Sequence, residues 1–376
     1  MDKFKLAIIV DTCMAGGVSK ALNDFIKCLS QTDLEITLFV KKFDTVKNFY
    51  LPDGVKCCPW PDKKRLPKVL KNKFLELLNK RNYQRSIVYN AEQYNSIEDE
   101  FDCVIGYQMI SNDVTVMTLD KINAKRKVLW LHGKKKFSKN NMKFFDNLYS
   151  KADMIVAVSK DTEERFKTLM PKSVNKTTTI HNFYDFDLIE AEANKKFNGF
   201  DKNDNEIVIV STGRISKEKG FDRVPEVTQK LVNDGHNIQW YVVGDGAMLS
   251  EVNENIKNKG LQEYIHMVGY KNNPYPYVKY CDIYVQPSYT EGFCTSTMEA
   301  KILKRPVVTT DVPGMNEQFV NEYDGLIVES SVDGLYNGIK LLIEDKHLYE
   351  SIVQNLEKQT LSNEEEVQKA LKVIKG

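Results

Sequence analysis

Short apolar runs recur through both halves of this 376-residue chain, and segments with helical spacing separate them. The runs lie at 5–10, 101–106, 127–132 and 154–159 in the first half, and at 207–213, 238–244, 265–269, 282–287 and 307–310 in the second. Strands that alternate with helices form parallel sheets with helices packed on their faces. We therefore expect an α/β protein built from parallel sheets.

The length of the chain indicates two such sheets. A single hydrophobic core stops growing at about 250–300 residues, and the hydrophobic content of 42% is enough for two cores of ordinary size. The chain turns polar around 185–200, so we place an N-terminal domain at 1–185 and a C-terminal domain at 186–360. A further helical stretch is expected within 361–376.

Two charged loops follow strands of the C-terminal half. The segment G-R-I-S-K-E-K-G places Arg214 and Lys219 after one strand, and E-G-F-C-T-S-T-M-E runs from Glu291 to Glu299 after another. Ligands of open α/β sheets bind at the carboxyl ends of strands. The cations suit the phosphates of a departing nucleotide diphosphate, and the carboxylates accept hydrogen bonds from hydroxyls. This combination predicts a nucleotide-diphosphate sugar as the ligand.

Each of these residues alone also has an ordinary structural interpretation. Arg214 and Lys219 are compatible with solvated surface charges. Ser296 is expected to cap a helix and so to place Glu299 in the first turn, yet Ser296-x-x-Glu299 also fits a capping box that uses Glu299 only to bond the cap. The free backbone N–H groups of that helix start would face the phosphates. The two loops together favour the ligand.

Several motifs between Ile207 and Val328 extend this pattern. They read V-S-T-G-R-I-S-K-E-K-G-F-D, W-Y-V-V-G-D-G, C-D-I-Y-V-Q-P-S-Y-T-E-G-F and R-P-V-V-T-T-D-V-P-G-M-N-E. With them the chain resembles the retaining family-four glycosyltransferases (glycosyl transferases group 1) of the bacterial surface-polysaccharide type. The resemblance covers nearly the whole chain. It implies the GT-B fold, in which two Rossmann-like domains face each other across a cleft and a C-terminal helix crosses back to the first domain.

The resemblance also implies roles for the residues of the two loops. Arg214 and Lys219 would hold the diphosphate, Glu291 the donor sugar and Glu299 the ribose. The further donor-binding residues that it implies are Gly292 and, through their backbone amides, Phe293, Cys294 and Thr295. Many family members have glycine or proline where Cys294 stands, so this chain departs from the family pattern there.

The N-terminal half carries weaker signals. Gly16 and Gly17 follow a strand and precede a helical pattern; by the resemblance they let the backbone approach a donor phosphate, whereas a plain tight turn is the alternative. The loop lacks the dinucleotide-binding fingerprint, which argues against a nicotinamide enzyme. His132 ends a strand where family members often place a histidine near the donor sugar, although strand-end histidines are commonly structural. Ser159 is expected to cap a helix.

Cysteine, histidine and hydropathy patterns limit the other possibilities. The seven cysteines are scattered without C-x-x-C spacing, and the five histidines show no metal-ligand spacing, so we expect no disulfide scaffold, no metal and no cofactor. No apolar run approaches the roughly 20 residues that span a bilayer. No secretory signal pattern is evident either. A cytoplasmic protein, free or peripheral at the inner face of the membrane, fits these patterns.

The net charge of +1 hides a basic first half and an acidic second half. Within the basic half, 63–81 places an apolar stripe among lysines, which is typical of a helix lying on an anionic membrane surface. A core-packed helix with a solvated basic face is the alternative. We expect no nucleic-acid partner.

These observations predict a retaining, metal-independent glycosyltransferase. It would move a sugar, from a UDP-sugar by family frequency, to a hydroxyl of a surface glycan or lipid-linked saccharide, with Arg214, Lys219, Glu291 and His132 as candidate catalytic residues. Three alternatives remain. A glycosidase would use two carboxylates but has no need of the cations. A nucleotide-sugar epimerase can share the architecture, and a non-catalytic partner subunit of a glycosyltransferase is the third.

Overall fold

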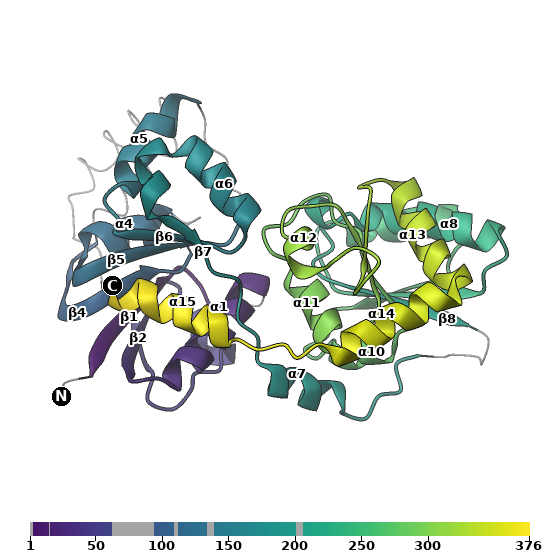
Figure 1. Cartoon of the computed structure of the whole chain (residues 1–376), viewed down its shortest axis with the longest axis horizontal. Coiled ribbons are helices and arrows are strands. Elements are labelled where there is room, and N and C mark those ends of the chain that lie inside the picture. Colours follow the sequence, from purple (N-terminus) through teal and green to yellow (C-terminus); the bar gives the residue numbers. More distant parts are fainter. Residues whose placement is uncertain (1–2, 15, 62–93, 109–111, 134–138, 201–205) are drawn as a thin grey trace. The chain divides into compact units, whose positions relative to one another are not determined.

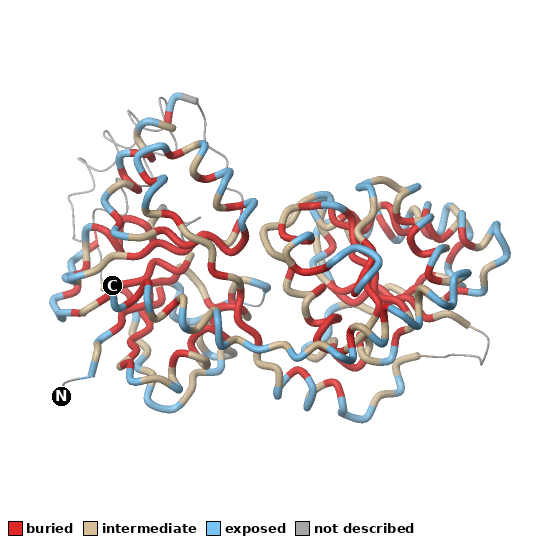
Figure 2. Tube along the Cα trace, in the orientation of Figure 1, coloured by how far each residue is buried: buried red, intermediate tan, exposed pale blue. Residues whose placement is uncertain are grey.

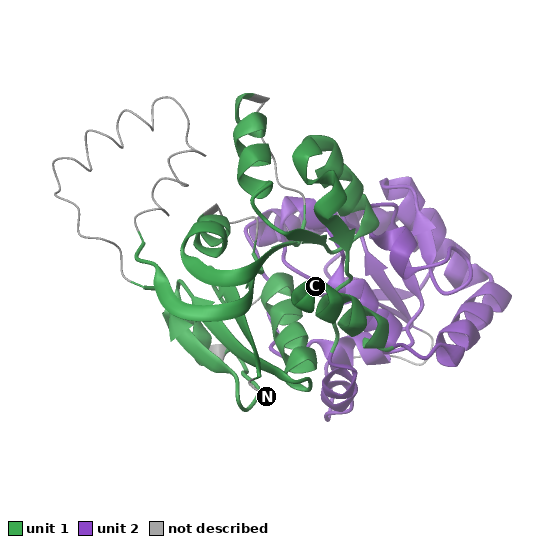
Figure 3. Ribbon diagram, turned by 60° about the vertical axis from the view of Figure 1, so that its left-hand side comes forward, with its two compact units in different colours: residues 1–184, 362–376 green, residues 185–361 purple. Residues whose placement is uncertain are grey.

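The computed structural model describes residues 3–14, 16–61, 94–108, 112–133, 139–200 and 206–376 (Figure 1). The chain divides into two compact units (Figure 3). Unit 1 comprises Met1–Tyr184 together with Ser362–Gly376, and unit 2 comprises Asp185–Leu361. The boundary that we placed between residues 185 and 186 is adjacent to this division.

In the described part of unit 1, seven parallel strands form one sheet in the order β3-β2-β1-β4-β5-β6-β7. Their bounds are β1 (Phe4–Val10), β2 (Leu34–Val40), β3 (Lys56–Pro59), β4 (Ile97–Gly106), β5 (Ile122–Leu131), β6 (Met154–Ala157) and β7 (Thr177–Thr179). The four strands expected in this half are present. The sequence analysis missed β2, β3 and β7.

Helices flank this sheet. They are α1 (Gly17–Ser30), α4 (Asn112–Asp120), α5 (Met142–Tyr149), α6 (Lys160–Leu169) and α15 (Glu364–Lys375), with short 3₁₀ segments at η1 (Phe43–Asn48), η2 (Lys139–Asn141) and η3 (Pro171–Lys176). On α1, Leu22, Phe25, Ile26 and Leu29 are fully buried. Figure 2 shows the buried stretches of both units in red. The Ser159 side chain accepts a hydrogen bond from the Thr162 N–H at 3.2 Å, which confirms the expected cap of α6.

The last helix, α15, packs on β4 and β5 of unit 1. Ala370, Val373 and Ile374 are buried there, and Arg126 Nε donates to the Val373 carbonyl at 2.6 Å. At the start of the helix, the Asn363 side chain accepts from the Tyr184 N–H at 3.1 Å and donates to the Tyr184 carbonyl at 2.7 Å. Unit 1 is therefore assembled from two separate stretches of the chain.

Within the residues described for unit 2, six parallel strands form a sheet in the order β10-β9-β8-β11-β12-β13. Their bounds are β8 (Ile207–Thr212), β9 (Ile238–Val243), β10 (Ile265–Gly269), β11 (Ile283–Gln286), β12 (Val307–Thr310) and β13 (Leu326–Val328). The five strands expected in this half are present, and β13 was missed. Ile209, Trp240, Val285 and Val308 lie in its core with no exposed surface.

Helices also flank the sheet of unit 2. They are α7 (Phe186–Ala193), α8 (Val224–Asn233), α9 (Leu249–Asn258), α10 (Tyr275–Tyr280), α11 (Thr295–Ile302), α12 (Met315–Gln318), α13 (Val332–Glu344) and α14 (Lys346–Lys358), with 3₁₀ turns at η4 (Lys217–Lys219) and η5 (Phe221–Arg223). On α13, Leu335, Ile339 and Leu342 are buried in the core of the unit.

In each sheet the strand order reverses at one point, because later strands are added on the other side of the first strand. It lies between β1 and β4 in unit 1, and between β8 and β11 in unit 2. The crevice outside the carboxyl ends of the two strands at such a switch point is the usual ligand site of open α/β sheets. The fold therefore singles out two edges for closer inspection.

The expected basic helix at 63–81 lies outside the described residues. Among the helices that are described, none is both long and apolar enough to cross a bilayer.

Candidate functional site

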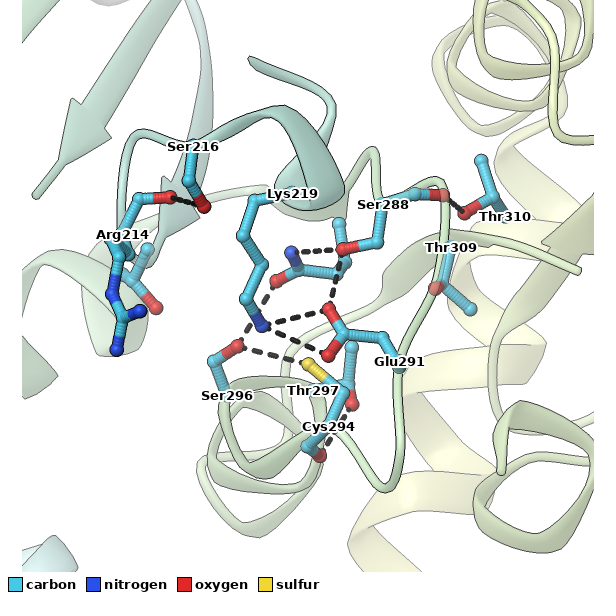
Figure 4. A network of polar contacts seen from close by, with 12 residues as sticks. Arg214, Ser216, Lys219, Ser288, Glu291, Cys294, Ser296, Thr297, Thr309 and Thr310 are labelled. Carbon is cyan, nitrogen blue, oxygen red and sulfur yellow. Dashed lines mark hydrogen bonds and ion pairs between the residues drawn. The ribbon is translucent and has the colours of Figure 1, made fainter. Parts of the chain in front are cut away.

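Lys219 and Glu291 meet at the switch point of unit 2 (Figure 4). Lys219 ends the η4 turn that follows β8, and Glu291 lies in the loop between β11 and α11. The Lys219 ammonium donates to both carboxylate oxygens of Glu291, at 2.8 and 2.9 Å. The side chains are 23% and 9% exposed, so the pair lies just below the surface, within reach of a ligand.

A glycine makes the close approach of the two loops possible. Gly220 adopts φ 70°, and a Cβ atom built there would lie 1.8 Å from the Pro287 carbonyl oxygen. The Tyr289 N–H also donates to the Glu218 carbonyl at 2.9 Å, which joins the loops through their backbones. The loop of Lys219 is therefore seated directly on the loop of Glu291.

A row of polar side chains supports Glu291 from the strand side. Ser288 Oγ donates to Glu291 Oε1 at 2.5 Å, and the Gln286 amide nitrogen donates to Ser288 Oγ at 2.9 Å. The Gln286 carbonyl oxygen accepts from the Tyr284 hydroxyl at 3.1 Å and from Ser296 Oγ at 3.0 Å. Lys219 and Ser288 both donate to the Glu291 carboxylate, so these contacts hold its oxygens in place.

The sequence analysis missed Tyr284, Gln286 and Ser288. A usable signal was present for Tyr284 and Gln286, because polar side chains two residues apart on an otherwise apolar strand lie on one face of it. All three are fully buried, and buried polar groups are hydrogen-bonded as a rule.

The charge state of the pair follows from its surroundings. Burial lowers the pKa of Lys219, but the neighbouring Cys294 and Glu291 outweigh this effect and the pKa stands above its ordinary value. Burial raises the pKa of the Cys294 thiol. The thiol is therefore uncharged near neutral pH, and Glu291 is the anion that keeps Lys219 protonated there.

Arg214 lies on the same loop but not in the ion pair. It is exposed, and Figure 4 shows its guanidinium directed away from Lys219 and Glu291. Its own backbone carbonyl accepts from Ser216 Oγ at 3.4 Å. The predicted role of Arg214 in holding the diphosphate therefore stays a prediction.

The start of α11 differs from the expectation. Cys294 is the N-cap and the helix begins at Thr295, so Ser296 is already inside it and Glu299 lies beyond the first turn. No side chain caps the helix, because Ser296 Oγ donates to Gln286 instead. Both the predicted Ser296 cap and the capping-box alternative are wrong. Glu299 itself is buried, with 6% exposure.

Gly292 and Phe293, between the ion pair and α11, pack against Gly314. A Cβ atom at Gly314 would lie 3.1 Å from the Gly292 carbonyl oxygen and 3.3 Å from the Phe293 ring. Gly314 also adopts φ 83°, which disfavours any larger residue. The proposed contacts of Gly292, Phe293, Cys294 and Thr295 with a donor remain predictions.

The predicted residues of the N-terminal half belong to unit 1. Gly16 precedes α1 with φ 150°, Gly17 is its first residue, and both are exposed. His132 directly follows β5, with its ring 4.4 Å from that of Tyr107. Its Nε2 atom is buried without a hydrogen-bond partner among the described residues. Burial lowers the pKa of His132 to about 3, so the imidazole is neutral at physiological pH.

The switch point of unit 1 gathers a different set of groups. Lys41 pairs with Asp11 at 3.2 Å and with Asp113, and Lys42 lies 3.7 Å from the other oxygen of Asp11. The Gln108 side chain accepts from the Asp11 N–H at 2.8 Å. These charges largely neutralise one another. No group of three or more metal-ligating side chains was found in the described parts of either unit.

The chain is similar to several known proteins. Residues 192–359 match the family model described as glycosyl transferases group 1. A Campylobacter jejuni protein named as an N-acetylgalactosamine-N,N'-diacetylbacillosaminyl-diphospho-undecaprenol 4-alpha-N-acetylgalactosaminyltransferase is 29% identical over 220 residues, 56% of this chain and 58% of that protein. The capsular polysaccharide biosynthesis glycosyltransferase CapM of Staphylococcus aureus is 28% identical over 209 residues, 54% of this chain and 55% of CapM. The matches thus span little more than half the length of these relatives.

A solved structure resembles the chain over nearly its full length. Anabaena HepE, crystallised with UDP and glucose, superposes with a TM-score of 0.73 at 18% identity and covers 98% of both chains. At this identity the likeness shows the fold alone. Together with the two parallel sheets, it confirms the expected GT-B class of α/β protein.

Proposed function

We propose that this chain, whose residues 192–359 belong to the glycosyl transferases group 1 family, is a retaining glycosyltransferase that uses a nucleotide-diphosphate sugar. The Lys219–Glu291 pair at the switch point of unit 2 is the observation that carries the proposal. It places a partly buried cation beside a partly buried carboxylate at the edge where open α/β sheets bind ligands. The cation can stabilise the negative charge of a diphosphate, and the carboxylate can accept hydrogen bonds from sugar hydroxyls.

The Lys219 ammonium has enough donors to contact both Glu291 and a phosphate of the ligand. An ammonium carries three N–H donors, and the contacts with Glu291 use two of them. The third is available to a phosphate oxygen without breaking the pair. Glu291 then keeps one oxygen bonded to Ser288 while the other accepts from a sugar hydroxyl. Arg214, exposed on the same loop, adds a second cation when its side chain turns toward the diphosphate.

The reaction follows from these positions. The bond between the sugar C1 atom and the diphosphate oxygen breaks, and the acceptor oxygen forms the new bond to C1 on the same face. The acceptor proton passes to an oxygen of the leaving diphosphate, whose growing charge Lys219 and Arg214 stabilise. The scheme needs no protein nucleophile and no metal ion. Tyr284, Gln286 and Ser288 act by orienting Glu291.

UDP is the proposed nucleotide, and a surface glycan or lipid-linked saccharide is the proposed acceptor. HepE was crystallised with UDP-glucose, and relatives are named for undecaprenol-diphosphate-linked and capsular saccharides. We propose that the protein works in the cytoplasm, at the inner face of the membrane, where such acceptors are presented. The predicted roles of Gly16, Gly17 and His132 on the donor also belong to this proposal.

A thermal-shift panel tests the donor. The protein is heated with UDP, GDP, ADP, CMP and their sugar conjugates, because a ligand at about 100 times its Kd stabilises the folded state by roughly 2.7 kcal/mol. We expect UDP and one UDP-sugar to raise the Tm most. If no nucleotide raises it, the proposed function fails.

A product analysis tests the stereochemistry. Proton NMR of the first product formed from an α-linked donor should show an α anomer. A β anomer would mean attack from the opposite face, and would make Glu291 a candidate general base.

A further inference from the structure

Tyr289 lies in the loop that carries Glu291, yet its contacts are with the segment that carries Lys219. Its N–H donates to the Glu218 carbonyl at 2.9 Å, and its hydroxyl donates to Asp222 Oδ2 at 3.0 Å. The guanidinium carbon of Arg223 lies 3.6 Å from the centre of its ring. Three different parts of Tyr289 are thus fixed by residues 218–223.

Arg223 is an unusual partner because it is buried. Its exposure is 3%, and Nε and Nη1 have no hydrogen-bond partner among the described residues. One contact, Nη2 with Ser330 Oγ at 3.2 Å, reaches the loop after β13. Burying a cation with unsatisfied donors costs free energy. Stacking on an aromatic face is the interaction that offsets this cost for arginine, and the Tyr289 ring supplies that face.

The stack is adjacent to the point where the two loops touch. A Cβ atom at Gly220 would lie 3.4 Å from Arg223 Nε as well as 1.8 Å from the Pro287 carbonyl oxygen. Gly220 directly follows Lys219, and Tyr289 stands two residues before Glu291. The stack therefore joins the two segments that carry the residues of the ion pair.

We propose that Arg223 and Tyr289 are positioning residues for the Lys219–Glu291 pair. Their stack, with the hydrogen bond from the Tyr289 N–H to Glu218, sets the separation at which the ammonium reaches both carboxylate oxygens. We call this set of contacts the Tyr289 clasp. The role of the clasp in nucleotide binding rests on the proposed function, whereas its effect on Lys219 does not.

The first measurement reads the pair directly, without any nucleotide. The chain is treated with a limiting amount of acetic anhydride, and the acetylation rates of Lys219 and Lys301 are compared by peptide mass spectrometry. Lys301 is the internal reference, because it is 9% exposed and pairs with Asp324 at 2.7 Å elsewhere in the same unit. When Glu291 moves away, the pKa of Lys219 falls and its reactive free amine rises by about tenfold per pKa unit.

The variants separate the parts of the clasp. Tyr289→Leu and Arg223→Met each remove the stack, and Tyr289→Phe keeps the ring and the backbone N–H but loses the Asp222 contact. Tyr323→Leu is the matched control, since Tyr323 is a tyrosine of similar exposure in the same unit, 48% against 45%. We expect Lys219 acetylation to rise several-fold in Tyr289→Leu and Arg223→Met, with Lys301 unchanged. Tyr289→Phe and Tyr323→Leu should stay close to the unaltered chain.

Two outcomes overturn the proposal. Unchanged Lys219 acetylation in both stack-removing variants shows that the pair forms without the clasp. An equal rise at Lys219 and Lys301 shows that the variants only loosen the unit as a whole.

The second measurement is UDP affinity by calorimetry. Misplacing one charge-assisted contact should weaken binding by about tenfold in Tyr289→Leu, with rescue in Tyr289→Phe. If the unaltered chain does not bind UDP, the proposed function fails while the acetylation result still decides the clasp. If UDP binds the unaltered chain and Tyr289→Leu equally, the clasp has no part in binding.

Discussion

The strand order reverses at equivalent points in the two sheets, yet the side chains gathered at these points differ in kind. At the edge between β8 and β11, one lysine meets one carboxylate in a pair that a buried row of hydrogen bonds supports. At the edge between β1 and β4, Lys41 is shared between Asp11 and Asp113, and Gln108 bonds the turn after β1. The first set can divide its donors and acceptors between a phosphate and a sugar. The second set pairs its two lysines with its own carboxylates, although Asp11 Oδ1 and Asp113 Oδ1 make no hydrogen bond among the described residues.

This difference teaches that topology fixes where a ligand can bind but not what binds. Both edges present loops at the carboxyl ends of neighbouring parallel strands. The unit 2 edge adds a glycine that lets backbone meet backbone at Gly220 and a clasp at Tyr289. We therefore expect the leaving diphosphate to bind at the unit 2 edge, and the Asp11–Lys41–Asp113 group of unit 1 to contribute mainly to stability.

The largest expected effect breaks the unit 2 edge. Arg214→Ala and Lys219→Ala should each lower kcat by on the order of 10²–10³, as the loss of one preorganised charge stabiliser does. Initial rates with the best donor from the nucleotide panel measure the effect. Lys217→Ala, an exposed lysine on the same turn, is the control and should leave the rate within a few-fold. Near-normal rates in both site variants would remove the proposed role of unit 2.

The next effect separates binding of the sugar from the chemistry at its anomeric carbon. Glu291→Gln removes the charge that pairs with Lys219 but keeps a side chain of the same shape. Turnover should fall by about 10- to 100-fold, in line with the loss of a hydrogen bond to a charged group. The anomer formed, read by proton NMR, should not change. A changed anomer would contradict the assignment of Glu291 to donor hydroxyls.

A smaller effect concerns unit 1 and acid. The pKa of His132 in the folded chain, about 3, lies below its ordinary value of 6.5, so the unfolded chain takes up a proton that the folded chain does not. Stability from this residue is therefore present above pH 6.5 and is lost as the pH falls toward 3. At pH 5 the loss is at most about 2 kcal/mol.

Urea unfolding at pH 8, 6 and 5 measures this loss in the unaltered chain and in His132→Gln. Tryptophan fluorescence follows the transition, with Trp60 and Trp130 in unit 1 and Trp240 in unit 2. The glutamine variant should show a shallower decline with acid. Equal slopes in the two proteins would mean that His132 is not buried in its neutral form.

The smallest expected effect is that of removing metal ions, which should leave the transfer rate unchanged. In neither unit do the described residues bring three metal-ligating side chains together, and the carboxylates at both switch points are paired with lysines. Because Lys219 and Arg214 are proposed to neutralise the leaving group, EDTA should leave the transfer rate unchanged. A loss of activity that Mg²⁺ or Mn²⁺ restores would show that the cations of unit 2 are not sufficient.

The alternation of apolar runs was enough to predict the α/β class, and nine strands lie where these runs occur. The missed strands show where the method fails. The apolar run Leu34–Val40 carries a local strand pattern that the analysis above does not include. Thr177–Thr179 is short and polar, and it forms β7 because β6 offers it a parallel partner. Such edge strands depend on tertiary pairing, which local pattern does not contain.

The sequence predicted the charged residues of the site but not the ion pair and hydrogen bonds that join them. Glu291 and Lys219 are 72 residues apart, and their motifs indicated one ligand without showing that the two side chains form a bidentate pair. The Ser296 prediction failed because a capping rule considers only neighbours in sequence. The hydroxyl of Ser296 is instead used by Gln286, on a strand that precedes the helix. Arg223 gave no signal, since a single arginine in a helical turn is ordinarily exposed.

The return of α15 to unit 1 has a consequence for the order in which the protein is made. Residues 185–361 form unit 2 without interruption, so this unit is complete before Ser362–Gly376 leave the ribosome. Unit 1 is begun first and finished last, because Ala370, Val373 and Ile374 fill part of its core. Domains fold as units during synthesis, and until α15 arrives the apolar groups that it covers on β4 and β5 stay open to water or to a chaperone. Unit 1 is thus synthesised before unit 2 but completes its core after it.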